Sequence, residues 1–353
     1  MITSDVRRAI ARAVRDEGLP PADPGLRPGG APGRYASSVA FASGEQPRAV
    51  AARLADRLAG EGIGRADVSG PGFIDITVTP EALAALPDRI IAAGADCARS
   101  DALDGVQVAA PPDGDPLAEL SWEKARAALA AELTARLAAA AGATAALPPY
   151  PERSRSSPPP QPLPVPGGAA DRSTSEKEAP RGGPRPPETE LGATVAYAGA
   201  DAVRFALARA LPGRPVRIDG REIARHVPGN PAYAVRYAHA RAASGVRWAA
   251  NSRPITLGRP AVPRHPVAHQ AESMLLDALS WLPERVAVAA RRGRPDEFAR
   301  YLEELASATI AALICAGYPA KIRVPAADKL ALAAQTALAA GLGLLGVAAP
   351  DRL

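Results

Sequence analysis

The stretch Pro228-Gly-Asn-Pro-Ala-Tyr-Ala-Val-Arg-Tyr-Ala-His-Ala-Arg241 opens a long run of helix-forming sequence. Asn230 suits the position before a helix, and the proline after it suits the first turn, where its missing N–H costs nothing. Tyr233, Tyr237 and Arg241 then recur every four residues and share one face of that helix. A stripe of this kind is most often part of a core.

The charges around this stretch favour a polyanion-binding face over a plain core stripe. Residues 202–264 contain twelve Arg and no Lys, against only Asp219 and Glu222. Aromatic rings interleaved with so much fixed positive charge are typical of an RNA-binding surface. The sequence therefore predicts that this helix contacts RNA.

Length and charge distribution fit a protein with one localised polyanion site. The 353 residues leave room for two or three domains, and the formal net charge is +5. Residues 1–147 carry 15 basic and 19 acidic groups, whereas residues 191–353 carry 21 basic and 12 acidic groups. The positive charge is thus concentrated in the C-terminal half.

Cysteine usage and hydropathy favour a cytoplasmic protein. Cys97 and Cys315 stand far apart without metal-ligand spacing, so we expect no disulfide framework and no metal site. We expect Cys315 to be a buried apolar side chain. Residues 2–17 read as an amphipathic helix with arginines throughout, not as a signal peptide. The uncharged residues 330–350 are expected to form a buried bundle helix and not a membrane span.

Periodicity predicts a small α/β unit at the N-terminus and a helical C-terminal half. Helices are expected over residues 2–17, 47–59 and 80–93, with a half-buried strand at 73–78 that alternates Phe73, Asp75 and Thr77 with apolar residues. Residues 148–190 are rich in Pro, Gly and Ser and are expected to be a disordered linker. Further helices are expected at about 200–211, 230–249, 267–281, 283–292, 295–316 and 326–345.

Four segments resemble the arginyl-tRNA synthetase family, in the same order. The run from Asn230 to Arg241 resembles the opening of its DALR-type anticodon-binding domain, although Ala234 replaces a family tyrosine, and residues 340–353 resemble its C-terminus. Residues 1–95 resemble its N-terminal additional domain, which grips the corner of the tRNA. The specific part there is Gly70-Pro-Gly-Phe-Ile-Asp75, where the family usually ends on Asn.

The fourth segment, residues 96–147, resembles the first strand–loop–helix unit of the class I catalytic domain. Gly114-Asp-Pro-Leu117 matches that loop, but Ala118-Glu-Leu-Ser121 stands where the family has His-x-Gly-His. Those imidazoles would stabilise the phosphate as arginine is adenylated, which Ala and Ser cannot do. The lysine loop that would embrace ATP is missing from residues 191–200 as well. The resemblance thus implies a relative that lacks most of the catalytic domain, is not an enzyme and needs no cofactor.

The predicted fold class is α+β and multidomain. An N-terminal additional domain (1–95), a vestigial Rossmann β-α unit (96–147) and a disordered Pro-rich linker (148–190) precede an all-α anticodon-binding bundle (191–353). The linker is expected to tether two tRNA-holding modules flexibly, in a chain too short for a whole synthetase.

The resemblance implies a non-catalytic tRNA-binding protein that holds or delivers tRNA, with tRNA-Arg as the preferred partner. Phe73 would stack on a base, whereas Asp75 only accepts hydrogen bonds and repels phosphate. One alternative is an adaptor for a synthetase or for an enzyme that uses arginyl-tRNA. Another is a retained or in-trans arginine–tRNA ligase activity. The residues that the resemblance places at the tRNA are Phe73, Asp75, Asn230, Tyr233, Arg236, Tyr237, Arg241 and Arg247.

Overall fold

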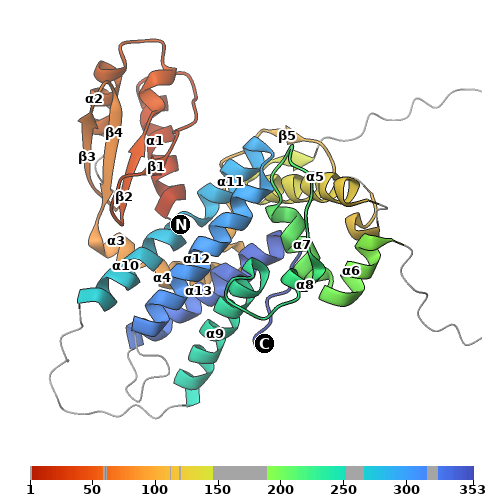
Figure 1. The fold of residues 1–353 in the computed structure, drawn as a ribbon. Coiled ribbons are helices and arrows are strands. Elements are labelled where there is room, and N and C mark those ends of the chain that lie inside the picture. The colour runs from red at the N-terminus through yellow and green to blue at the C-terminus, as the bar shows by residue number, and fades with distance from the viewer. Residues whose placement is uncertain are drawn as a thin grey trace, which may run out of the picture.

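The computed structural model describes residues 2–58, 60, 62–111, 113–118, 121–145, 189–251, 266–315 and 325–353. Helices dominate the described residues, and the strands form two small sheets (Figure 1). The predicted linker, 148–190, lies outside the described residues except for its last two positions. Those two, Thr189 and Glu190, cap and begin helix α6.

The N-terminal part is a four-stranded antiparallel sheet in the order β1-β2-β4-β3, and it shares one apolar core with helices α1 and α2. Strand β4 alternates as predicted, because Ile74, Ile76 and Val78 are buried while Asp75 is exposed. The elements are α1 (Ile2–Asp16), β1 (Arg27–Pro28), β2 (Arg34–Ser37), η1 (Val39–Ala42), α2 (Pro47–Arg57), β3 (Ile63–Ser69) and β4 (Phe73–Val78).

The single helix predicted over residues 80–93 is wrong, because the chain forms two helices there. Helix α3 (Pro80–Ala84) ends at Ala85, and α4 (Leu86–Ala93) begins directly after it. Pro87 has no N–H to donate to the preceding turn, so one continuous helix cannot pass through it. Helix α4 and the short turn η2 (Gly94–Ala98) pack against α13 (Pro325–Leu344).

Residues 107–145 form a strand–helix–strand unit with parallel strands. Strand β5 (Gln107–Val108) pairs with β6 (Thr144–Ala145), and η3 (Pro116–Ala118) and α5 (Trp122–Ala140) connect them. Ser121 caps α5, since its Oγ accepts a hydrogen bond from the Lys124 N–H at 3.3 Å. Helix α5 packs against α7 and α11 of the C-terminal bundle.

The C-terminal part is a helical bundle whose long helices α9, α12 and α13 pack on one another. Ala and Leu side chains fill its core, as the composition predicts. Across the described residues, no helix combines the length and apolar character that a membrane crossing requires. The remaining elements are α6 (Glu190–Ala198), α7 (Ala200–Arg209), α8 (Gly220–Ile223), α9 (Pro231–Asn251), α10 (Pro266–Ser280), α11 (Leu282–Arg292) and α12 (Pro295–Cys315).

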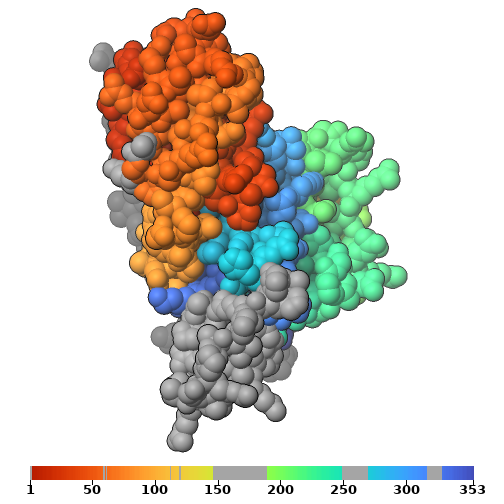
Figure 2. All heavy atoms as spheres, turned by 90° about the vertical axis from the view of Figure 1, so that its left-hand side faces the viewer, coloured from red at the N-terminus to blue at the C-terminus, as the bar shows by residue number. Residues whose placement is uncertain are grey.

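The N-terminal sheet domain rests directly on the bundle (Figure 2). The Arg7 guanidinium of α1 makes a two-pronged ion pair with Glu284 of α11, at 2.6 Å and 3.0 Å, with side chains only 9% and 5% exposed. Beside it Thr3 Oγ1 donates to the Ser280 carbonyl at 2.6 Å, and the Tyr35 hydroxyl donates to Ser280 Oγ at 2.8 Å. A packed polar interface, and not the linker alone, therefore joins the two ends of the chain.

The first prediction tests this interface by replacing Arg7 with methionine. Arg7→Met keeps the length of the side chain but leaves the buried Glu284 carboxylate unpaired, so unfolding free energy should fall by about 3–5 kcal/mol. Arg8→Met is the matched control, because Arg8 pairs with Asp5 at the surface and should cost no more than about 1 kcal/mol. Urea denaturation followed by circular dichroism measures both, and equal losses would contradict a structural role for the buried pair.

The second prediction concerns the close contact between α12 and α13. A Cβ on Gly341 would lie 2.4 Å from Cδ2 of the buried Leu302, whereas a Cβ on Gly343 would meet open space. Gly341→Ala should therefore destabilise the bundle by about 1–2 kcal/mol through overpacking. Gly343→Ala should stabilise it by about 0.5–1 kcal/mol, because alanine favours the helix. Thermal unfolding of the two variants should move in opposite directions.

Candidate nucleic-acid interface

Three rings form a column at the start of α9. The Tyr233 and Tyr237 rings, one helical turn apart, stack with centroids 5.7 Å apart and planes 20° apart. His226, in the loop before the helix, continues the column against Tyr233 at 5.3 Å and 12°. Tyr237, at the other end, is 38% exposed. The column therefore presents a ring to solvent, where a further flat ring can stack.

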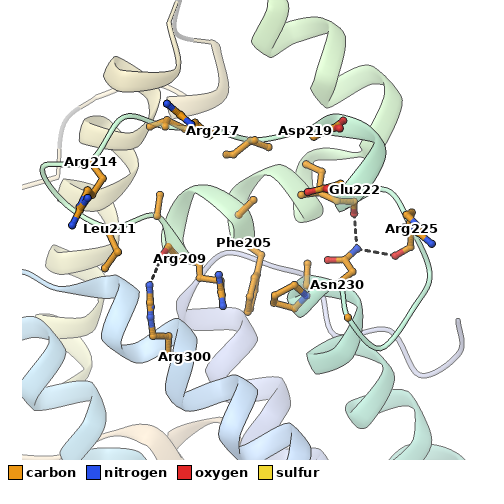
Figure 3. A pocket seen from close by; sticks show the side chains of 18 of the residues that line it. Phe205, Arg209, Leu211, Arg214, Arg217, Asp219, Glu222, Arg225, Asn230 and Arg300 are labelled. Carbon is orange, nitrogen blue, oxygen red and sulfur yellow. Dashed lines mark hydrogen bonds between the residues drawn. The ribbon is translucent and has the colours of Figure 1, made fainter.

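Asn230 holds the loop that carries His226. Its side-chain amide donates to the carbonyls of Ile223 at 2.7 Å and Arg225 at 2.8 Å, so it joins α8 to the first turn of α9 (Figure 3). Its own carbonyl accepts from Ala234 N at 2.8 Å, as expected for the residue that precedes the helix. The amide therefore fixes the loop before any ligand arrives.

The arginines of α9 are engaged within the fold. Arg236 is half-buried and lies 3.6 Å from a carboxylate oxygen of Asp201, while Arg247 donates to the Asp351 carbonyl at 2.9 Å. Arg241, one turn beyond Tyr237, is also half-buried and has interactions of its own. These three side chains lie on the same helix as Tyr233 and Tyr237, but each of them interacts with other groups of the protein.

A second aromatic pair lies on the N-terminal domain. Phe73, at the start of β4, meets Phe41 of η1 with centroids 4.9 Å apart, and Phe41 is 43% exposed. The preceding turn needs glycine, because a Cβ on Gly72 would lie 2.8 Å from the backbone carbon of Pro47. The Gly-Pro-Gly turn thus lets Phe73 lie beside the helix that follows Phe41. Figure 1 places this domain and helix α9 in separate parts of the molecule.

Asp75 lies on the exposed face of the sheet, two residues beyond Phe73. It is paired across the ladder with Asp67 of β3 and with Ala36 of β2, so two carboxylates face each other on neighbouring strands. Arg65 forms an ion pair with Asp67 at 2.5 Å. This negative charge next to Phe73 disfavours a phosphate at this position.

The loop after β5 carries no imidazole at its described positions. Ala118 ends the short helix η3, and Ser121 is occupied as the cap of α5. Residues 119 and 120 lie outside the described part of the chain. Neither described side chain can stabilise a phosphate as an imidazole would.

The described residues hold no cluster of three or more metal-ligating side chains. His269 is exposed on α10, and His265, four residues before it, lies outside the described residues. Cys97 is buried, but Cys315 is exposed, so the expectation of a buried Cys315 is wrong. Cys315 is the last residue of α12, two positions beyond the buried Leu313.

Sequence reasoning missed two ring partners, His226 and Phe41. His226 is seven residues from Tyr233 and outside the helix, so helical spacing cannot connect them. Phe41 lies in a different element from Phe73, and only the fold brings them together. The sequence marks these two residues in one way only, because each carries an aromatic or imidazole ring close to a glycine-containing turn.

Family models match both ends of the chain. Residues 1–78 match the arginyl tRNA synthetase N terminal domain, and residues 235–353 match the DALR anticodon binding domain. The chain is related to the arginyl-tRNA synthetases. Phe73 and Asp75 lie within the first matched segment, and Arg236, Tyr237, Arg241 and Arg247 lie within the second.

Individual synthetases support the same relationship. The arginine–tRNA ligase of Micrococcus luteus is 35% identical over 175 residues, which cover 46% of this chain and 31% of that enzyme. The ligase of Paenarthrobacter aurescens is 34% identical, over 46% of this chain and 30% of the enzyme. The matches thus span about a third of the length of these synthetases.

The fold agrees with that of a solved synthetase. Thermus thermophilus arginyl-tRNA synthetase aligns over 100% of both chains with a TM-score of 0.59 and 16% sequence identity. At this identity the comparison shows that the chain has an arginyl-tRNA synthetase-like fold. Of the ring column, Tyr237 lies within the segment that matches the DALR anticodon binding domain, and His226 and Tyr233 precede that segment.

The third prediction concerns the two thiols of this synthetase relative. Burial raises the pKa of Cys97 to about 12, so at pH 8 the Cys97 thiol is protonated as well as shielded. An aromatic disulfide reagent should therefore modify one thiol in the native protein and two in urea. Cys315→Ser should abolish the native reaction, whereas Cys97→Ser should leave it unchanged. A native reaction that survives Cys315→Ser would contradict this assignment.

Proposed function

We propose that the protein holds tRNA, with a preference for tRNA-Arg, and does not aminoacylate it. The observation that carries the proposal is the His226–Tyr233–Tyr237 ring column, whose exposed end lies in a segment that matches an anticodon-binding domain. Bases of a tRNA loop are unstacked and free to lie on protein rings. Tyr237 would carry the contact, and the charges of Arg241 and its neighbours would favour the phosphates.

The loop between β5 and α5 supports a non-catalytic role. We interpret the strand–helix–strand unit as the remnant of a class I catalytic domain. At the positions of the two family histidines it has Ala118 and Ser121. The four histidines of the chain, at 226, 239, 265 and 269, all follow the linker, and residues 191–200 contain no lysine. These features of the sequence support the proposal that the protein does not aminoacylate tRNA.

The docked N-terminal domain supports a second tRNA contact. Phe73 and the exposed Phe41 would meet a base at the corner of the tRNA. Because Arg7, Tyr35 and Thr3 fix this domain on the bundle, both contacts belong to one body. A preorganised pair of contacts loses less freedom on binding than two tethered modules would.

A tRNA holder implies a partner that supplies or uses the tRNA. From a tRNA-holding role we expect the partner to be a separate synthetase or an enzyme that consumes arginyl-tRNA. An adaptor role, in which the basic bundle face binds such a protein directly, would leave tRNA affinity independent of the ring column.

The fourth prediction tests the ring column with Tyr237→Ala. Loss of one base–aromatic stack should weaken binding to tRNA-Arg about 5- to 100-fold. Tyr197→Ala is the matched control, because Tyr197 is 68% exposed on α6 and stacks on no other ring among the described residues. Filter binding with purified tRNA-Arg and an unrelated tRNA measures both variants. Equal binding of the two tRNAs, or equal effects of the two substitutions, would overturn the proposal.

The same titrations at two salt concentrations test the charge contribution. With several phosphates neutralised, the logarithm of the association constant should fall linearly with the logarithm of salt concentration. ATP–pyrophosphate exchange by the pure protein would show that it is an enzyme after all. Exchange that requires a second protein would favour activity in trans.

A further inference from the structure

A cavity of about 600 Å³ lies beside the ring column, between α7, α8, the loop at 210–219 and the first turn of α9 (Figure 3). Its volume is typical of a small-molecule site. Apolar side chains line it, among them Phe205, Val216, Ile218, Ile223 and Ala232. These side chains form an apolar surface against which a flat ring can pack.

Five arginines line the same cavity, against the two carboxylates of Asp219 and Glu222. Arg209 forms an ion pair with Glu303 at 2.6 Å, and the other four have no carboxylate partner among the described residues. Their numbers are 214, 217, 225 and 300. The Nη1 of Arg300 is a buried donor that no described group accepts from. Positive charge therefore exceeds negative charge in the lining of the cavity.

The walls of the cavity are held in place from both sides. Arg126 of α5 donates to the carbonyls of Leu211 and Arg214, which fixes one end of the loop. Asn230 holds another part of the wall, the end of α8 and the segment after it, through the carbonyls of Ile223 and Arg225. A cavity fixed in this way exists before its ligand binds, which lowers the entropy that binding costs.

We propose that this cavity binds a nucleoside phosphate. The apolar lining would take the base, and the unpaired arginines would take the phosphate, because guanidinium groups bind phosphate oxygens in a two-pronged geometry. Asp219 and Glu222 can accept hydrogen bonds from amino or hydroxyl groups of the nucleoside. An inorganic phosphate would leave the apolar lining unused and should bind more weakly.

The nucleotide can come from two sources. The segment 225–232 forms one wall of the cavity and also carries His226 and the start of the ring column. A nucleotide next to a base stacked on Tyr237 could therefore enter the cavity, and this source rests on the proposed function. A free mononucleotide is the other source and does not depend on it.

The fifth prediction compares Arg217→Ala with Arg221→Ala. Both arginines are exposed and four residues apart, but only Arg217 lines the cavity. Calorimetric titration of the full chain with AMP and with CMP at low salt should show binding that Arg217→Ala weakens about tenfold. Arg221→Ala should bind as the unaltered protein does, and inorganic phosphate should bind less tightly than either nucleotide. Ala206→Phe, which narrows the cavity, should weaken both nucleotides without weakening phosphate.

Equal weakening by the two arginine variants, or phosphate binding as tight as nucleotide binding, would overturn the proposal in favour of diffuse surface charge. The tRNA-Arg affinities of both variants and of Tyr237→Ala then identify the source. A loss with Arg217→Ala but not with Arg221→Ala would place a tRNA nucleotide in the cavity. If only Tyr237→Ala lowered the affinity for tRNA-Arg and neither mononucleotide bound, the proposed nucleotide site would be wrong and the proposed tRNA-holding function would stand. If the protein bound mononucleotides selectively but did not bind tRNA, the nucleotide site would stand and the proposed tRNA-holding function would be wrong.

Discussion

The arrangement of the whole molecule depends on the buried ion pair between Arg7 and Glu284. The Glu284 carboxylate is stable so far from water only with its partner, because alone it would carry an uncompensated desolvation cost, and Arg7 also pairs with the more exposed Asp23 at 3.0 Å. Hydrogen bonds of Thr3 and Tyr35 to Ser280 surround the pair. Few alternative dockings of the N-terminal domain would satisfy all of these groups at once, so this interface sets its orientation on the bundle.

Through this interface the N-terminal sheet domain and the C-terminal bundle pack together, although a long Pro-rich stretch separates them in the sequence. Helix α5 of the strand–helix–strand unit packs on α7 and α11, so the unit fills space between the two ends of the chain. The N-terminal sheet domain and the helical bundle are therefore held in fixed positions relative to each other. We regard this packing as the physical basis of the proposed tRNA-holding role.

Asn230 has a comparable role at the candidate site. Its amide fixes the segment that presents His226 to Tyr233 on one side and walls the arginine-lined cavity on the other. A single buried side chain thus supports both the ring column and the cavity. The arginines of this region divide in the same way, because Arg236 and Arg247 hold neighbouring segments, while Arg214, Arg217 and Arg225 meet no carboxylate among the described residues.

The sequence by itself determined the local features of this protein. The spacing of Tyr233 and Tyr237, the cap at Ser121 and the alternation along β4 involve neighbours within a few residues, so propensity and periodicity predict them. Local pattern alone still failed at residues 80–93, where the helix is interrupted at Ala85 because Pro87 has no N–H to donate.

Only the tertiary structure decided which distant groups meet. Arg7 and Glu284 lie 277 positions apart, and Phe41 reaches Phe73 across the sheet domain. The pairing of Arg236 with Asp201 likewise depends on how α7 and α9 pack. Such contacts arise from packing and desolvation over the whole chain, and no local pattern of residues records them.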